Sequence, residues 1–168
     1  MDESLASKLA SLRTARQGPG VPRLHKPAMV ALLLHRYIAD GWVAASHDDI
    51  TDDLKRLLTA VGVEGQIRTE YPFWRLRTDG FWTVDGADEL EAAMNDAGDV
   101  VTADLTAAHI GRWTQDALAD FRADGARRHL NTVLGTYFDA AQRAALLAAL
   151  PSRRDFAQSP ITNNGRED

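Results

Sequence analysis

The sequence from Pro27 to Gly41 reads PAMVALLLHRYIADG and contains the longest apolar block of the chain. Proline suits the first turn of a helix, because no backbone amide hydrogen is needed there. Apolar side chains then follow on nearly every side of the expected helix, and the glycine at position 41 is a typical helix C-cap. We therefore predict a central buried helix over residues 27–40.

Further helices are predicted on both sides of this segment. Leucines at positions 5, 9 and 12 share one face of an expected helix over residues 5–17, which GPGVP at 18–22 should end. Ser46–Asp49 resembles a capping region and begins a helix that continues to Gly62. Later helices are expected over 114–122, from Asp124 or Gly125 to Phe138, and over 139–150.

Aromatic residues dominate the middle of the chain. YPFWRLR at 71–77 and FWTV at 81–84 flank Asp79-Gly80, which predicts a β-hairpin. Strand alternation would then place Arg75 and Arg77 on one face, opposite Trp74 and Leu76. The expected fold class is mainly α (α+β), a single helical domain over residues 1–150 with a small β-hairpin or sheet, followed by a polar tail over 151–168.

Composition narrows the function classes. The chain has 168 residues and no cysteine, which excludes disulfides and thiolate zinc sites. No run approaches the roughly 18 apolar residues of a membrane span, and the N-terminus lacks an apolar signal core, so we expect a cytoplasmic protein with no membrane partner. A net charge of −5 argues against non-specific coating of nucleic acid, although bases gather between Lys8 and Lys26.

Enzyme motifs are absent from the sequence. It contains no P-loop, GxGxxG, HExxH, GxSxG or nuclease signature. His47-Asp48-Asp49 could hold a metal, but a capped helix start explains this tripeptide better. We predict no catalytic residue, no metal and no cofactor.

Three short segments carry binding features. Arg23 to Pro27 (RLHKP) places cations just before the central helix, where free amides and the helix dipole favour an anion; a solvated loop is the equal alternative. Tyr71-Pro72 forms a small rigid apolar step, whereas Trp74 and Trp82 are expected in the core. In HIGRW, 109–113, the glycine permits close backbone approach and the arginine offers a forked donor.

Taken in order, three segments resemble the sulfur-binding domain of phosphorothioate-sensing, McrA-like HNH (type IV) restriction endonucleases. They are LHKPAMVALLLHRYI (24–38), EYPFWRLRTDGFWTV (70–84) and HIGRWTQDALADFR (109–122), and the resemblance covers about residues 5–150. An HNH nuclease domain commonly follows in such proteins. The resemblance therefore implies a recognition part without catalysis, whose tail would lead to a nuclease domain absent from this sequence.

The resemblance also implies the partner, double-stranded DNA in which sulfur replaces a non-bridging phosphate oxygen. Tyr71 and Pro72 would form the floor of a sulfur pocket, and His25 and Lys26 would line its wall or hold the DNA backbone. Lys26, Arg112 and His25 are the candidates to neutralise the negative charge. Contacts to the DNA backbone or bases would come from Arg23, Arg68, Arg75, Arg77, His109 and Gly111. Family members often have a Gly-Gly type turn where this chain has Gly111-Arg112.

Two other function classes compete with DNA recognition. The aromatic hairpin could dock a partner protein in a protein–protein interaction or regulatory module, and an enzyme with an unrecognised site is a third possibility. The sequence leaves the oligomeric state open.

Overall fold

The computed structural model describes residues 4–12, 16–18, 21–22, 24–65, 67–87 and 109–151. Its α-helices are α1 (Leu5–Ala10), α2 (His25–Asp40), α3 (His47–Ala60), α4 (Glu70–Arg75), α6 (Gln115–Asp120), α7 (Ala126–Tyr137) and α8 (Ala140–Ala149). A 3-10 helix, η1 (Leu76–Asp79), follows α4, and a π-helix, η3 (Phe121–Gly125), joins α6 to α7. The strands are β1 (Arg16–Gly18), β2 (Val21–Pro22), β3 (Ala44–Ala45), β4 (Trp82–Val84) and β5 (Gly111–Trp113). The predicted fold class is confirmed.

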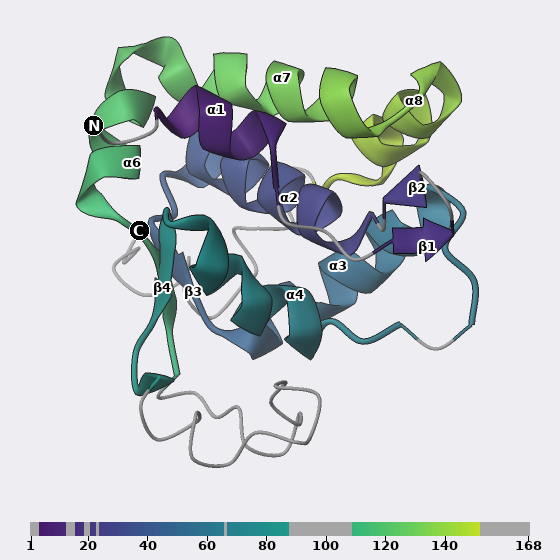
Figure 1. The fold of residues 1–168 in the computed structure, drawn as a ribbon, viewed down its shortest axis with the longest axis horizontal. Coiled ribbons are helices and arrows are strands. Elements are labelled where there is room, and N and C mark those ends of the chain that lie inside the picture. Colours follow the sequence, from purple (N-terminus) through teal and green to yellow (C-terminus); the bar gives the residue numbers. More distant parts are fainter. Residues whose placement is uncertain are drawn as a thin grey trace, which may run out of the picture.

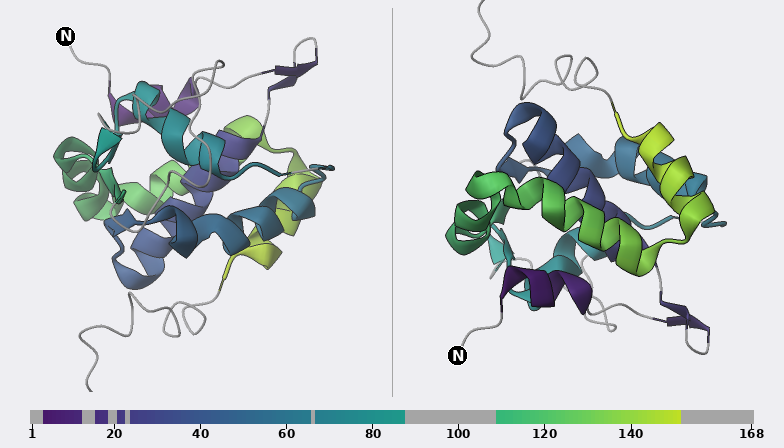
Figure 2. Two further views of the ribbon diagram at one scale, coloured as in Figure 1. Left: turned by 90° about the horizontal axis from the view of Figure 1, so that it is seen from below. Right: turned by 90° about the horizontal axis from the view of Figure 1, so that it is seen from above.

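Helix α2 is the centre of the fold. It packs against α7 on one side and against α3 and α4 on the other, while α1 lies along α7 and α8 along α3 (Figures 1 and 2). Residues 28–34 are all buried. Gly41 adopts the left-handed conformation with φ of 72° and caps the helix, donating its amide to the carbonyl of Tyr37. The central helix is confirmed, and it begins at His25.

The ends of α3 and α8 follow their capping sequences. Ser46 and Asp49 form a reciprocal capping box at the start of α3, and Asp139 and Gln142 form another at the start of α8. Helix capping thus accounts for the tripeptide His47-Asp48-Asp49, which follows Ser46. Among the described residues, no cluster of ligand side chains suits a metal ion, and none of the described helices is long and apolar enough to cross a membrane.

Helix α1 is shorter than predicted, because a residue far along the chain satisfies its end. The hydroxyl of Tyr137 donates to the carbonyl of Leu9 at 2.6 Å and accepts from the amide of Leu12 at 2.8 Å. The predicted continuation to residue 17 is wrong: Arg16–Gly18 pairs instead with Val21–Pro22 in a two-stranded antiparallel sheet.

The predicted hairpin across Asp79-Gly80 is also wrong. Residues 70–79 are helical as α4 and η1, and Gly80, with φ of 92°, ends η1. Proline is tolerated at position 72 because first-turn amides need no helical partner. Phe73, Trp74 and Leu76 are buried. Core packing thus overrides the strand preference of the aromatic residues.

A three-stranded antiparallel sheet closes one end of the fold, with strand order β3-β5-β4. Trp82, Val84 and Trp113 face the core, whereas Thr83 and Arg112 pair opposite each other on the exposed face. A Cβ at Gly111 would lie only 1.9 Å from the Trp82 indole, so glycine is required here. The small sheet was expected, but its central strand β5 was not.

The predicted helix from Asp124 or Gly125 to Phe138 is confirmed as α7, whose N-cap is Gly125 and whose C-cap is Phe138. Gly125 has helical φ and ψ, so α7 follows η3 without a break in the backbone. A Cβ at Gly125 would lie 2.0 Å from the carbonyl oxygen of Asp120, so this π-turn depends on glycine. Residues 152–168, most of the predicted tail, lie outside the described residues.

Candidate nucleic-acid interface

The Tyr71-Pro72 step lies in the first turn of α4. The tyrosine is half-buried and the proline is buried. The guanidinium of Arg75, one turn further on, lies 5.8 Å from the centre of the tyrosine ring. The step is therefore held on a helix that packs on α2 and α3, with the tyrosine partly open to solvent.

A buried polar cluster anchors the start of α4 to α3. His47 Nε2 lies 2.8 Å from Thr69 Oγ1, which in turn lies 2.6 Å from Thr51 Oγ1. The His47 ring also meets the Phe73 ring edge-on at 5.7 Å. Burial lowers the pKa of His47, so the neutral ring is favoured in the fold. Sequence reasoning missed this role of His47, because Thr69 lies 22 positions away in the chain.

Lys26 forms a buried ion pair with Asp79, the last residue of η1. Its Nζ lies 2.7 Å from Asp79 Oδ2, and the two side chains are 8% and 3% exposed. This pair joins the first turn of α2 to the end of the α4–η1 segment, so the lysine charge is matched inside the protein. His25, the first residue of α2, is half-buried, and Arg23 lies outside the described residues.

The arginines around α4 differ in their surroundings. Arg68 is exposed, with Nη1 3.6 Å from Glu70 Oε2. Arg77 lies with its guanidinium 3.5 Å from the Trp74 ring centre and donates from Nε to the Trp74 carbonyl. Because the segment is helical, the predicted strand arrangement, with Arg75 and Arg77 on one face and Trp74 on the other, is wrong.

Arg112 projects from the exposed face of β5 and binds Asp85. Its Nε and Nη2 donate to the carboxylate at 2.9–3.1 Å, and this hydrogen bonding raises the pKa of the arginine. His109 is buried against Gly86, where a Cβ would lie 2.9 Å from the imidazole. The close approach expected at Gly111 is made by Trp82 of the protein itself.

Trp82 links the two parts of the candidate site. Its indole Nε1 donates to the carbonyl of Phe73 in α4 at 3.2 Å, and its ring covers Gly111 of β5. The Phe73 and Trp82 rings also meet edge-on at 5.9 Å. The structure thus joins the segment of Tyr71 and Pro72 to the segment of Gly111 and Arg112 through one buried indole.

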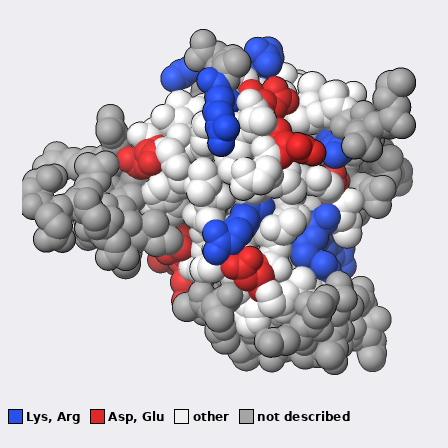
Figure 3. All heavy atoms as spheres, turned by 90° about the vertical axis from the view of Figure 1, so that its left-hand side faces the viewer, with Lys and Arg blue, Asp and Glu red and all other residues white. Residues whose placement is uncertain are grey.

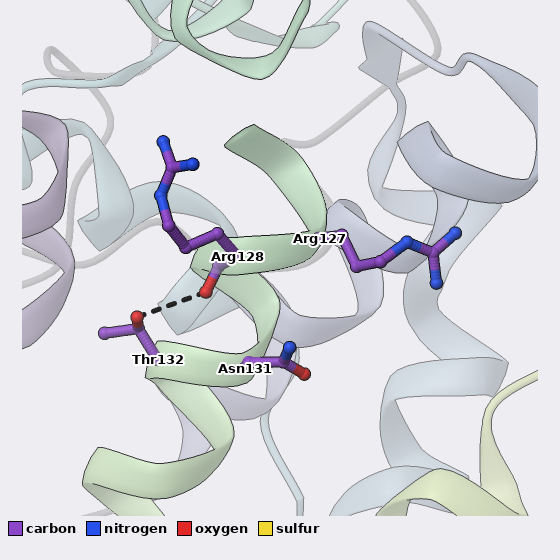
Figure 4. A pocket seen from close by; sticks show the side chains of 4 residues that line it. All are labelled: Arg127, Arg128, Asn131 and Thr132. Carbon is purple, nitrogen blue, oxygen red and sulfur yellow. Dashed lines mark hydrogen bonds between the residues drawn. The ribbon is translucent and has the colours of Figure 1, made fainter. Parts of the chain in front are cut away.

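Charge on the described surface is mixed. On the side shown in Figure 3, basic and acidic side chains lie next to one another and form no single basic field. A shallow hollow on α7 is lined by Arg127, Arg128, Asn131 and Thr132. The two arginines extend to different sides of the helix, and Thr132 donates to the Arg128 carbonyl at 3.1 Å (Figure 4). No motif in the sequence singled out this hollow.

Comparison with known proteins gives the class of this fold. The family described as ScoMcrA-like, DNA sulfur-binding domain matches residues 2–152. The chain belongs to this family of DNA-recognition modules, as the resemblance predicted.

Solved structures identify particular relatives. The sulfur-binding domain of ScoMcrA complexed with phosphorothioated DNA is 21% identical, with a TM-score of 0.69 over 89% of this chain and 100% of that one. The corresponding domain of SprMcrA, also complexed with phosphorothioated DNA, is 20% identical, with a TM-score of 0.60 over 86% and 90%.

The structure of the whole type IV phosphorothioation-dependent restriction endonuclease ScoMcrA matches at 20% identity and a TM-score of 0.69, over 86% of this chain. This chain spans only 32% of that protein. At these identities the likeness shows the fold. No curated protein matches the chain.

Proposed function

We propose that this chain binds double-stranded DNA carrying a phosphorothioate linkage, as a recognition module that performs no catalysis itself. The observation that carries the proposal is the family match over residues 2–152. The segments behind the resemblance span most of α2, then α4 with η1 and β4, then β5 with α6. Helix α2 packs on α4, β4 packs on η1 and pairs with β5, and Trp82 of β4 donates to the Phe73 carbonyl of α4.

Sulfur recognition is assigned to Tyr71 and Pro72, with His25 and Lys26 as the wall. Sulfur is larger, more polarizable and less strongly hydrated than oxygen, so apolar surroundings favour it. Burying a well-hydrated phosphate oxygen there without a donor costs about 1–3 kcal/mol. Sulfur avoids much of this cost and gains dispersion contacts with the proline ring and the tyrosine.

The negative charge of the linkage still needs partners. Because Asp79 already matches the Lys26 ammonium, we assign Lys26 to the shape of the wall. Arg112 is likewise matched by Asp85, so we assign charge compensation to the N-terminus of α2, whose N-cap, Leu24, provides no side-chain hydrogen bond to the first-turn amides.

Positioning on the duplex is assigned to the cations around this region. Phosphate contacts set register and orientation, and base contacts carry sequence information. We keep as candidate backbone or base contacts Arg23, Arg68, Arg75 and Arg77, and we reassign the predicted contacts His109 and Gly111 to a supporting role. Exposed Arg68 suits a phosphate contact, whereas buried His109 and Gly111 support the loop rather than reach outward.

The parent protein is proposed to be an HNH endonuclease, with residues 151–168 leading to its nuclease domain. By binding modified DNA, this module would bring the nuclease domain to that DNA. We expect this to take place in the cytoplasm. The rival protein-docking function loses its motivating feature, since Phe73, Trp74, Phe81 and Trp82 are all buried.

The test compares matched duplexes with and without one sulfur, by fluorescence anisotropy at two salt concentrations. We expect strong preference for the sulfur duplex and weaker binding at higher salt, because phosphate contacts release counterions. Equal, negligible binding to both duplexes would contradict DNA recognition and favour a protein partner. Strand breaks produced by this chain with a divalent metal would contradict the absence of catalysis.

A further inference from the structure

Asp85 and Arg112 form a side-on pair at the open face of the three-stranded sheet. Arg112 Nε lies 3.1 Å from both carboxylate oxygens of Asp85, and Nη2 lies 2.9 Å from Oδ2. The side chains are 49% and 42% exposed. A surface ion pair of this kind adds little to stability, so its geometry invites a functional explanation.

Both residues stand on firmly held backbone. Arg112 lies in the central strand β5, between Ala44 of β3 and Thr83 of β4. The amide of Asp85 donates to the Ile110 carbonyl at 2.8 Å, which fixes the turn after β4 against the start of β5. Sites built on paired strands place side chains more accurately than sites on loops.

The side-on contact leaves one edge of the guanidinium available. Asp85 occupies the edge made by Nε and Nη2, and among the described residues nothing hydrogen-bonds to Nη1. Within the described part of the chain, the end-on edge, made by Nη1 and the second Nη2 hydrogen, is therefore open. The cross-strand neighbours of Arg112 are Ala44 and Thr83, whose short side chains do not reach over the guanidinium.

An end-on guanidinium edge matches the O6 and N7 acceptors of guanine in the major groove. We propose that Asp85 is a positioning residue that fixes Arg112 to read a guanine close to the modified linkage. This inference rests on the proposed function and deepens it by naming the base. An arginine held in place before binding loses less rotamer freedom when it meets the base.

The pair also has little net charge. A free arginine would attract any phosphate, whereas a carboxylate-paired arginine contributes less to sequence-independent binding. Asp85 thus directs Arg112 toward base reading rather than backbone attraction.

The experiment measures the affinity of the chain for sulfur-containing duplexes in which each guanine near the linkage is replaced, one at a time, by 7-deazaguanine. This base lacks the N7 acceptor and leaves the sulfur untouched. For the unaltered chain, one position should weaken binding by roughly 5- to 100-fold, the usual worth of a bidentate arginine–guanine contact. Arg112→Ala should bind both duplexes of that pair alike.

Asp85→Asn should retain the preference for sulfur over oxygen and lose most of the discrimination at that guanine. Asp52→Asn is the matched control, because Asp52 is exposed on α3 and the charge change is the same. Urea unfolding of each variant confirms that the fold is intact. Discrimination in Asp85→Asn equal to that of the control would overturn the positioning role.

Two further outcomes separate this inference from the proposed function. If the unaltered chain prefers sulfur but responds to no 7-deazaguanine, the guanine inference is wrong and sulfur recognition stands. If it shows no sulfur preference, the proposed function itself is wrong.

Discussion

Lys26 and Asp79 tie the first turn of α2 to the end of η1 through a buried ion pair. Burying two charges is costly, and their mutual attraction offsets this cost only while both are present. The pair therefore controls how the α4–η1 segment, and with it Tyr71 and Pro72, lies against the central helix. A cation beside the expected site can act through the fold rather than by touching DNA.

Replacing Lys26 with methionine should lower the free energy of unfolding by about 3–5 kcal/mol, because it leaves a buried carboxylate without its partner. Urea unfolding followed by circular dichroism measures this change. Lys55→Met, an exposed lysine on α3, is the control and should change stability by less than about 1 kcal/mol.

The double variant Lys26→Met with Asp79→Asn should recover part of the loss, because it removes the buried carboxylate charge that Lys26 matched. A Lys26→Met protein as stable as the Lys55→Met protein would contradict a structural role for the pair.

At the scale of elements, helix α4 is where sequence and structure differ most. Aromatic residues around Asp79-Gly80 predicted a hairpin, yet the segment is helical because α2, α3 and Trp82 surround Phe73 and Trp74. The residue pattern of a short segment predicts strands poorly, because the strand preference of a residue depends on the neighbours against which it packs. By contrast α2 and α3 were predictable, because caps and apolar spacing act within one segment.

The candidate site was predictable in its residue types but not in its contacts. The segments containing Tyr71 and Arg112 were identified from their sequence, and the prediction that Trp82 lies in the core is confirmed. The role of Asp85, the link that Trp82 makes to α4 and the His47–Thr69 cluster were missed. Each of these acts on a partner distant in the chain. Only the folded structure reveals such pairings.

The anchor of α4 gives a pH-dependent prediction. The pKa of His47 is lowered in the fold, so the unfolded chain binds a proton more readily than the folded one. Stability from the neutral ring is fully present above the unfolded pKa of about 6.5 and declines as the pH falls below it. Urea unfolding between pH 7.5 and 5 measures this decline.

His47→Gln removes the titrating group at this anchor. We expect the variant to be less stable at pH 7.5 and to lose less stability on acidification than the unaltered chain. If the free energy of unfolding falls equally with pH in the variant and in the unaltered chain, His47 does not contribute to the acid sensitivity.

At the scale of the whole molecule, the chain carries a net charge of −5 and a mixed surface on the side seen in Figure 3. Electrostatic attraction between the whole chain and DNA therefore cannot account for DNA binding. The proposed recognition has to come from the local geometry of the site. Trp82 contributes to this local geometry, because it joins the Tyr71-Pro72 step of α4 to the sheet that presents Arg112. A core indole thus couples the proposed sulfur contact to the proposed base contact.

The central claim is that the step formed by Tyr71 and Pro72 distinguishes sulfur from oxygen. The most direct measurement is the ratio of affinities for the sulfur and oxygen duplexes in Tyr71→Ala and Pro72→Ala, with Leu147→Ala, an exposed leucine on α8, as the control. We predict that the ratio falls roughly tenfold in both site variants, about 1.4 kcal/mol, and is unchanged in the control. An undiminished ratio in both folded site variants would contradict the account.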